Sequence, residues 1–547
     1  MSPKYLASHL PSSITFSSSV DPFFTVSTLT VNSSSLTIVN GINLPASFSS
    51  SLKKLAFNNE KYLLIQREEI LKRISSFGNK LYLEFGGKLF DDFHAERVLP
   101  GFKHDSKLKM LLGLKDKAEI VIAVNSADIQ NNKIREDLGL TYEAEVIRLI
   151  EAFNQVGLFV SSVVFTKFHD EPLTVIFKQK LENLGIKTYI HYTIQGYPHN
   201  IPLVVSEDGL GKNEYIETTR PLVVVTAPGP GSGKMGTCLS QLYHDHNKGI
   251  SAGYAKFETF PVWNVPLKHP LNLAYEAATL DLNDVNMIDP FHFDKYGVMA
   301  VNYNRDVEVF PLLKAIFEKI YGECSYNSPT DMGVNMLGFC IEDDDVLVEA
   351  CKQEIIRRYF NAKKHCFFGK YDSKIIDKAA MLMNQADAPV TLRKCVAATN
   401  AKAEEKQTSV IGIEMPDGSV VTGKTSNLLR SPASVILNAL KKFANLDDDL
   451  LLISPNVIEP IHELKTKSLG YRNPRLHLDE MLIALSIAAT TNPLAKLALD
   501  QLPKLRGLQA HSSAILGDFD LKYLKCLGIQ ITEEPLLDPS KKHRLVK

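Results

Sequence analysis

The sequence feature that constrains the fold most is an apolar, strand-like run that leads directly into a glycine-rich loop and a helix-like stretch. Residues 220–237 read RPLVVVTAPGPGSGKMGT, and residues 238–246 have helical character. Glycine lets a backbone fold closely around an anion, so that successive N–H groups point inward, and the helix N-terminus adds partial positive charge. Lys234 can reach terminal phosphate oxygens. The segment therefore predicts a phosphate-binding loop between a strand and a helix.

The loop matches the P-loop pattern in part. That pattern requires Gly, four residues, Gly-Lys and then Ser or Thr. Gly233 and Lys234 fit, but Pro228 occupies the first glycine position and Met235 the hydroxyl position. Methionine does not ligate Mg²⁺, which prefers oxygen ligands. Thr237 lies two residues further on, and two helical steps turn its side chain to another side of the helix.

The loop also matches the dinucleotide pattern G-x-G-x-x-G, at Gly231, Gly233 and Gly236. That pattern is typically followed by an acidic residue about 20 positions later, and Glu258 is near that distance. A glycine-rich turn that merely starts a helix is the structural alternative. The residues predicted to bind the ligand are Gly229, Gly231, Ser232, Gly233, Lys234, Gly236 and Thr237.

Strand-like and helix-like stretches alternate through the first half of the chain. The strand-like stretches are residues 80–85, 119–124, 158–165, 187–192, 202–205, 221–226 and 249–257. Helical patterns at residues 142–156 and 173–184 separate some of them. This alternation predicts an α/β fold with a mostly parallel sheet, P-loop or Rossmann-like, with helices on both faces. Ligands of such sheets bind beyond the carboxyl ends of the strands.

The composition divides the chain into four segments. They are a serine-rich, poorly ordered leader (1–56), a nucleotide-binding-like α/β domain (57–329), a helical domain (330–395) and a C-terminal α/β domain (396–547). In the last, apolar runs flank Pro416-Asp417-Gly418, which is a hairpin signature. Residues 450–454 are expected to form a further strand there. Residues 1–52 also resemble an organelle transit peptide, being rich in serine and poor in acids.

Charge and cysteine usage exclude several classes of protein. The formal net charge of −1 argues against a nucleic-acid coat or a polybasic membrane binder. No run approaches the ~20 apolar residues that a membrane-spanning helix needs. The seven cysteines form no CxxC pair, which favours a reducing compartment. We therefore expect a cytoplasmic protein, or an organellar one if the leader is a transit peptide, that binds neither nucleic acid nor a membrane and could form a homo-oligomer.

Further candidate residues follow the glycine loop. Asp284 and Asp289 are candidate Mg²⁺ ligands and could orient a nucleophile, since carboxylates near phosphates commonly do so; helix capping is the alternative. His292 is a candidate general acid or base, and a hydrogen-bonded structural histidine is the alternative. Arg305 is a candidate phosphate ligand, or else the ion-pair partner of Asp306.

A second glycine loop follows the strand-like residues 80–85. Gly86 and Gly87 precede Lys88, so this loop could contact an anionic substrate. A tight turn that only ends the strand explains the same residues.

Several long motifs resemble an uncharacterised family. They are TAPGPGSGKMGTCLSQLYHD, GYAKFETFPVWNVPLKHPLNLAYEAATLDLNDVNMIDPFH, KLYLEFGGKLFDDFHAERVLPGF, SPTDMGVNM, LISPNVIEPI and NPRLH. The family, of about 500 residues and known only as a domain of unknown function, occurs mainly in bacteria. The resemblance covers residues 57–535. It implies a nucleotide-binding-like α/β domain, a helical domain and a C-terminal α/β domain, and it implies no established activity.

The sequence thus leads to three functional hypotheses. The first is an NTP-dependent phosphotransferase or NTP hydrolase that uses Mg²⁺ and ATP, or another nucleotide or small phosphorylated ligand. Lys234 and the loop N–H groups would stabilise its transition state. The second is a non-catalytic nucleotide sensor or assembly protein, which Met235 favours. The third is a dinucleotide-dependent oxidoreductase.

Overall fold

The computed structural model describes residues 55–534, except residues 88, 91, 136–138 and 259–260. The chain divides into residues 1–52 and residues 53–547, and the following description concerns the second unit. The predicted order of residues 1–54 therefore lies outside the described residues. Ala56, assigned to the leader by the sequence, is fully buried, and its N–H donates to the Pro100 carbonyl at 2.8 Å. The described fold thus includes the end of the predicted leader.

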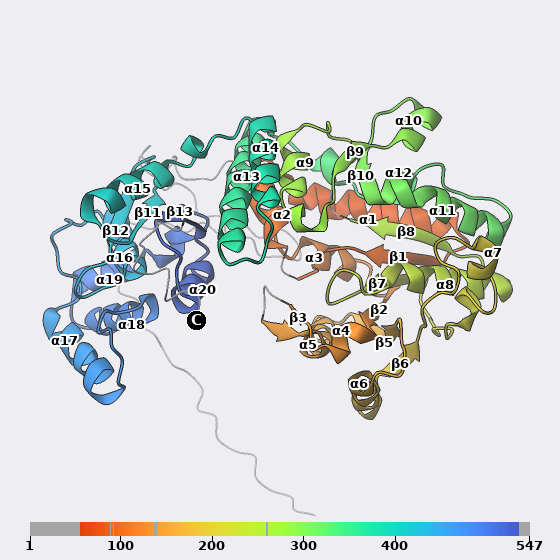
Figure 1. Ribbon diagram of the computed structural model, residues 1–547, viewed down its shortest axis with the longest axis horizontal. Helices are drawn as coiled ribbons and strands as arrows, with labels where there is room; N and C mark the ends of the chain where they lie inside the picture. The colour runs from red at the N-terminus through yellow and green to blue at the C-terminus, as the bar shows by residue number, and fades with distance from the viewer. Residues whose placement is uncertain (1–54, 88, 91, 136–138, 259–260, 535–547) are drawn as a thin grey trace, which may run out of the picture. The chain divides into compact units, whose positions relative to one another are not determined.

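A parallel six-stranded sheet forms the centre of the first half of the described fold (Figure 1). Its strands, in spatial order, are β6 (Lys187–Ile190), β5 (Phe159–Thr166), β2 (Ala118–Asn125), β7 (Leu222–Thr226), β1 (Leu81–Phe85) and β8 (Gly253–Phe257). Every neighbouring pair is parallel. The predicted α/β class with a mostly parallel sheet is confirmed.

The strand order reverses direction at β7. The chain runs from β1 past one position to β2, continues outward to β5 and β6, and then returns to β7 between β2 and β1. From β7 it passes over β1 to reach β8 at the other edge. Right-handed crossovers then place the connecting helices on opposite faces of the sheet. The carboxyl end of β7 therefore lies at a topological switch point, where ligands bind in open α/β sheets.

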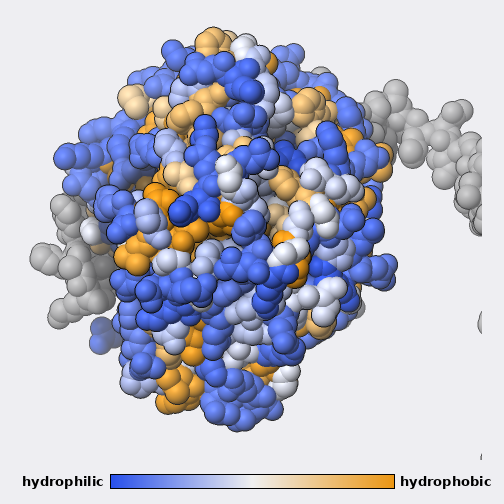
Figure 2. Space-filling view, turned by 90° about the vertical axis from the view of Figure 1, so that its right-hand side faces the viewer, coloured by the Kyte–Doolittle hydropathy of each residue, from blue (hydrophilic) through white to orange (hydrophobic). Residues whose placement is uncertain are grey.

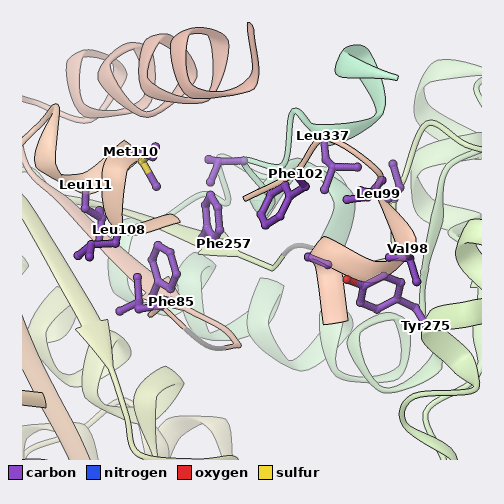
Figure 3. Packing of buried hydrophobic residues seen from close by; sticks show 14 of the residues in the cluster. Phe85, Val98, Leu99, Phe102, Leu108, Met110, Leu111, Phe257, Tyr275 and Leu337 are labelled. Carbon is purple, nitrogen blue, oxygen red and sulfur yellow. The ribbon is translucent and has the colours of Figure 1, made fainter. Parts of the chain in front are cut away.

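The first face of the sheet carries the largest hydrophobic core. Leu81, Leu83 and Phe85 of β1 belong to this core. The rings of Phe85 and Phe257 stack there at 4.4 Å (Figure 3). The helices on this face are α1 (Asn59–Ser76), α2 (Phe93–Val98), α3 (Ser106–Leu112), α4 (Ser126–Gln130), α5 (Tyr142–Gln155), α6 (Pro172–Asn183), α9 (Pro270–Glu276), α13 (Asp344–Phe367) and α14 (Lys374–Gln385).

The second face has a separate core that includes Tyr82 of β1 and Tyr254 of β8. It is covered by α7 (Ile201–Val204), α8 (Lys234–Asn247), α11 (Asn304–Tyr321) and α12 (Pro329–Met332). Because side chains alternate along a strand, Glu84 and Lys256 face this same side. The helix that follows the glycine loop and the charged residues of β1 and β8 therefore share one face of the sheet.

A buried carboxylate fixes α8 on the second face. Asp245 is fully buried and pairs with the Lys80 ammonium at 2.9 Å. It also accepts hydrogen bonds from the hydroxyls of Tyr82 at 2.7 Å and Tyr215 at 2.9 Å. Removing one partner of a buried ion pair costs about 3–5 kcal/mol, so this network holds the helix firmly in register with the sheet.

Shorter elements complete this half. They are two small hairpins, β3 (Ile134–Arg135) with β4 (Leu140–Thr141) and β9 (Asn286–Ile288) with β10 (Val301–Tyr303), and the helix α10 (Pro290–Tyr296). The predicted helical segment 330–395 contains α13 and α14. Their buried residues, such as Ile355 and Leu382, join the core of the first sheet face rather than forming a core of their own.

The C-terminal part has its own four-stranded sheet and core. Its elements are β11 (Val410–Glu414), β12 (Val420–Lys424), β13 (Gln509–Ser512), β14 (Gln530–Glu533), α15 (Lys394–Lys406), α16 (Ser431–Phe443), α17 (Pro455–Glu463), α18 (Leu478–Ala488), α19 (Pro493–Leu499) and α20 (Asp518–Cys526). The predicted hairpin is confirmed: β11 and β12 pair antiparallel around a turn in which Gly418 has φ 81°.

Two predicted strands are wrong. Residues 201–204 form α7, because Pro202 occupies the first turn and the Asn200 side chain accepts from the Leu203 N–H. Proline lacks a donor for a strand ladder but suits a helix start. Residues 450–454 form an irregular segment that buries Leu452 and Ile453 and caps α17 with Ser454. A short apolar run does not by itself distinguish a strand from a buried loop.

The surface carries both hydrophobic and hydrophilic residues. Figure 2 shows hydrophobic residues in several separate patches between hydrophilic ones on one face. Among the helices of the described residues, none combines the length and apolar character that crossing a bilayer requires.

The stability of this fold should depend on pH through two buried histidines. Burial lowers the pKa of His191 and of His94 to about 4. Between about pH 6.5 and pH 4, the unfolded chain binds protons at these sites that the folded chain does not. The free energy of unfolding should therefore fall as the pH falls, by about 1.4 kcal/mol per pH unit for each histidine.

Urea denaturation at a series of pH values measures this slope. His191→Gln should reduce the slope of the unfolding free energy against pH by the contribution of about one proton, which is about 1.4 kcal/mol per pH unit. The control His246→Gln replaces an exposed imidazole and should leave the slope unchanged. An unchanged slope in His191→Gln would contradict the assignment.

Candidate functional site

The glycine loop lies at the carboxyl end of β7 and leads into α8. Gly231 and Gly233 have φ values of 72° and 82°, in the left-handed region that favours glycine. Gly233 is the N-cap of α8, and no side chain caps that helix end. The predicted order of strand, loop and helix is therefore confirmed.

The loop presents a continuous series of free backbone donors. Among the described residues, no group accepts a hydrogen bond from the backbone N–H groups of residues 229 and 231–236. The first intramolecular bond after them runs from the Thr237 N–H to the Gly233 carbonyl at 3.0 Å. Ser232 is fully buried, and buried N–H groups are rarely left without a partner. Such donors at a helix N-terminus suit an anion.

Contacts from β5 and α5, together with a bond within the loop, hold the loop in this conformation. The Thr166 hydroxyl, at the end of β5, donates to the Ser232 carbonyl at 2.8 Å. The Ser232 hydroxyl donates in turn to the Gly229 carbonyl at 2.8 Å. A Cβ at Gly233 would lie 2.7 Å from the Thr166 hydroxyl oxygen, and one at Gly229 would collide with the Tyr142 hydroxyl. Both glycines are therefore required by close packing.

The side chains of Lys234 and Thr237 differ in whether they have partners within the protein. Among the described residues, none bonds to or forms an ion pair with the half-buried Lys234 ammonium. Thr237 is 1% exposed, and its hydroxyl donates to the Gly233 carbonyl at 3.1 Å. Its hydroxyl is therefore engaged in the helix rather than replacing the hydroxyl that Met235 lacks. Lys234 is the cation of the loop that is available to a ligand.

A cluster of charged side chains lies at the carboxyl ends of β1 and β8. Glu84 pairs in register with Lys256, and both face the second side of the sheet. The Tyr254 hydroxyl donates to Glu84 at 2.7 Å. The Lys256 ammonium bonds to both oxygens of Asp306 at 2.7 Å and pairs with Glu258 at 3.1 Å. These attractions outweigh the effect of burial and raise the pKa of Lys256.

Arg305 extends this cluster. Its guanidinium pairs with Asp284 at 3.2 Å, with Glu258 at 3.6 Å and with Asp306 at 3.9 Å. Burial raises the pKa of Glu258 and the pKa of Asp284. The cluster has two cations, Lys256 and Arg305, and four carboxylates, those of Glu84, Glu258, Asp284 and Asp306. It therefore carries excess negative charge. Arg305 thus pairs with acids, as its alternative reading expected.

Strand β1 connects the glycine loop with the charged cluster. β8 is not a neighbour of β7, because β1 lies between them. Burial raises the pKa of the Cys238 thiol on α8, which Glu84 raises further and Lys234 lowers. Glu84 also raises the pKa of Lys256. Glu84 therefore acts electrostatically on both the start of α8 and the cluster.

The second glycine loop borders the cluster as well. The Gly86 N–H donates to the Phe257 carbonyl at 2.8 Å, which ties the ends of β1 and β8 together. A Cβ at Gly86 would lie 2.8 Å from Cγ of Glu258. Gly87 has φ 73°. Lys88 lies outside the described residues, so its predicted ligand contact stays a prediction.

Asp289 and His292 have structural partners. Asp289 is fully buried and caps α10 by accepting from the N–H groups of Phe291 and His292. Its second oxygen accepts from the Thr330 hydroxyl at 2.6 Å. His292 Nδ1 lies 3.1 Å from the Ser328 hydroxyl. These contacts match the capping and hydrogen-bonding alternatives, and they leave Asp289 few free lone pairs for a metal.

The described residues contain no group of three or more His, Cys, Asp or Glu side chains arranged to hold a metal ion. Mg²⁺ that accompanies a nucleotide, however, takes most of its ligands from phosphates and water and few from protein. Asp284, next to Arg305, is the predicted metal ligand that belongs to the cluster. Its role in metal binding stays a prediction.

Sequence reasoning missed several residues of the site. Thr166 and Tyr142 support the loop from distant segments, and Thr166 had one signal, as a polar residue that ends a buried strand. Glu84 also had a signal, as a charged residue within the apolar run LYLEF. Asp306 was considered only as a partner for Arg305. The chain's one tryptophan, Trp263, was not considered.

Comparison with known proteins gives a family and no activity. The model described as "Domain of unknown function DUF1846, N-terminal" matches residues 55–387, and the model described as "Domain of unknown function DUF1846, C-terminal" matches residues 391–542. A UPF0371 protein of Streptococcus pneumoniae (strain Hungary19A-6) is 52% identical over 484 residues, 88% of this chain and 98% of that protein. A UPF0371 protein of Streptococcus thermophilus (strain ATCC BAA-491 / LMD-9) is 52% identical over 493 residues, 90% of this chain and 100% of that protein.

Proposed function

The chain belongs to the DUF1846 family, and we propose that it binds the phosphate groups of a nucleotide at residues 228–237 and is an NTP-dependent phosphotransferase or hydrolase. One observation carries this proposal: the backbone N–H groups of residues 229 and 231–236 have no acceptor among the described residues, and Lys234 stands free beside them. The first N–H groups of any helix are unpaired, but the buried Ser232 N–H would be costly to leave without an acceptor in a loop that served only as a turn.

The proposed chemistry depends on position and charge. The loop N–H groups and Lys234 would hold the terminal phosphates and stabilise negative charge that develops in the transition state. The excess carboxylates at the ends of β1 and β8 would repel a phosphate directly. They suit a Mg²⁺ ion that binds between them and the phosphates, and Asp284 is the residue that we propose faces it.

The topology weighs against a dinucleotide-dependent oxidoreductase. In that class the glycine loop follows the first strand, and the acidic residue that binds the ribose ends the next strand of the unit. Here the loop follows β7, after four earlier strands of the sheet. Glu258 is paired with Lys256 and Arg305. The topology does not weigh against a non-catalytic nucleotide sensor. A sensor would bind the nucleotide without hydrolysing it or transferring its phosphate, and this distinguishes it from the enzyme.

Calorimetric titration of the full-length protein tests the proposal. ATP, GTP, NAD and NADP are titrated separately, each with and without Mg²⁺. We expect Mg²⁺-dependent binding of a triphosphate, followed by release of nucleoside diphosphate on incubation. Binding without turnover would favour the sensor, and binding of none of the four nucleotides would overturn nucleotide binding at this loop.

A further inference from the structure

A pocket at the carboxyl end of β8 is lined by residues that lie outside the proposed nucleotide-binding loop. Its cavity volume is about 50 Å³, and the pocket opens to solvent. Lys256 and Glu258 line it from the end of β8, and Asp306 lines it from α11. Asn302 of β10 and Thr330 of α12 complete its polar lining. The pocket thus collects residues from three segments of the chain, 256–263, 301–306 and 329–335.

Trp263 supplies a flat apolar wall to this pocket. Its indole N–H donates to the Asn335 carbonyl at 2.9 Å, and its ring packs against Phe339 and His292. The ring is therefore held in place before any ligand binds. A rigid aromatic face together with a few polar groups is the usual composition of a small-molecule site.

The charges of the pocket select against an anion. Glu258 and Asp306 carry two negative charges, and the Lys256 ammonium that pairs with both carries one positive charge. A further phosphate or carboxylate would therefore be repelled. A hydroxyl group both donates and accepts hydrogen bonds, so it can pair with these carboxylates and with the Asn302 amide. The lining thus fits a neutral, hydroxyl-bearing molecule.

We propose that this pocket binds the phosphoryl acceptor, a neutral polyol or monosaccharide, and that Glu258 takes the proton of the hydroxyl that is phosphorylated. The inference rests on the proposed phosphotransferase function. The acceptor oxygen forms a bond to the terminal phosphorus of ATP, and the bond from that phosphorus to its bridging oxygen breaks. The hydroxyl proton passes to a carboxylate oxygen of Glu258, and ADP leaves.

The position of the pocket supports this transfer. Neighbouring strands lie about 4.8 Å apart, so the ends of β7 and β8, with β1 between them, are about 10 Å apart. A triphosphate held at the end of β7 and an acceptor molecule in the pocket would each span part of that distance, so that the acceptor hydroxyl could approach the terminal phosphate.

The single tryptophan makes the pocket directly observable. Trp263 fluorescence is titrated with glycerol, myo-inositol and glucose in full-length protein, with and without Mg²⁺ and a non-hydrolysable ATP analogue. ADP release from ATP is then measured with each compound. We expect a saturable change in fluorescence with at least one compound, and we expect that compound to accelerate ADP release.

Two pocket variants and one control sharpen the test. Glu258→Gln should keep the fluorescence response within about tenfold in affinity and slow the stimulated ADP release by about 10²–10⁴-fold. Asn302→Leu should abolish the fluorescence response and leave binding of the ATP analogue intact. The control Glu217→Gln changes an exposed carboxylate that pairs with Lys187 at the far edge of the sheet. It should alter neither the fluorescence response nor the stimulated ADP release.

Each outcome decides the inference. Absence of a saturable response to all three compounds overturns the pocket, even if ATP binds at the loop. A response without stimulated ADP release overturns the acceptor role. A response in protein that binds no nucleotide overturns the proposed function and the acceptor role together, and shows that the failure lies at the loop rather than in the pocket.

Discussion

Lys234→Ala is expected to weaken binding of the ATP–Mg²⁺ complex by about 10- to 100-fold, the loss of a charged contact worth about 1.5–3 kcal/mol. Folding should hardly change, because no described residue pairs with the Lys234 ammonium. We expect the free energy of unfolding to stay within about 0.5 kcal/mol of the wild-type value. Calorimetric titration gives the affinity, and urea denaturation gives the stability of the same preparation.

Two further variants define this result. Lys314→Ala removes an exposed lysine of α11 that pairs weakly with Glu318 at 3.9 Å, and it should leave both measurements unchanged. Lys234→Arg keeps the positive charge but replaces a compact ammonium by a planar group, so it should recover only part of the affinity. Wild-type affinity in Lys234→Ala would contradict a role of this lysine in phosphate binding.

Gly233→Ala should damage both stability and nucleotide binding, far more than Gly231→Ala. Each glycine has a positive φ, so alanine costs about 1–2 kcal/mol at either position. At Gly233 the new Cβ would also lie 2.7–2.9 Å from the side chain of Thr166, whereas nothing lies within 4 Å at Gly231. Overpacking adds about 1–3 kcal/mol, and the shift breaks the bond from Thr166 to the Ser232 carbonyl.

The comparison separates backbone strain from packing. Urea denaturation should give Gly233→Ala a larger loss of stability than Gly231→Ala, and calorimetry should find nucleotide binding lost in the former and reduced in the latter. Adding Thr166→Ala to Gly233→Ala should restore part of the stability, because it removes two of the three closest atoms. Equal losses in the two single variants would show that packing against Thr166 does not hold the loop.

Much of the fold could be predicted because its signals are local. The run from Leu222 to Thr226 followed by glycines is a strand and a loop in any α/β protein, and the same holds for the hairpin around Gly418. The strands predicted at residues 202–205 and 450–454 were wrong, because short apolar runs carry no periodicity that distinguishes a strand from another structure. Asn200, Pro202 and Ser454 are capping signals that outweighed apolar character there.

The parts of the site that were missed depend on strand order. Local sequence does not state that β7 inserts between β2 and β1, since that order results from burying both faces of the sheet at once. The insertion places Glu84 between the loop and Lys256. It also brings Thr166 against Ser232, 66 residues away in the chain.

The sequence by itself determined the α/β class, the glycine-rich loop with its lysine, and the family. These follow from residue patterns within single elements, where the backbone conformation of glycine and the periodicity of apolar side chains decide the structure. The tertiary structure alone decided which carboxylates gather at the ends of β1 and β8, that Asp289 caps a helix, and that Trp263 lines a pocket with Glu258. Those arrangements join segments far apart in the chain, and only the packing of the whole sheet and its helices brings them together.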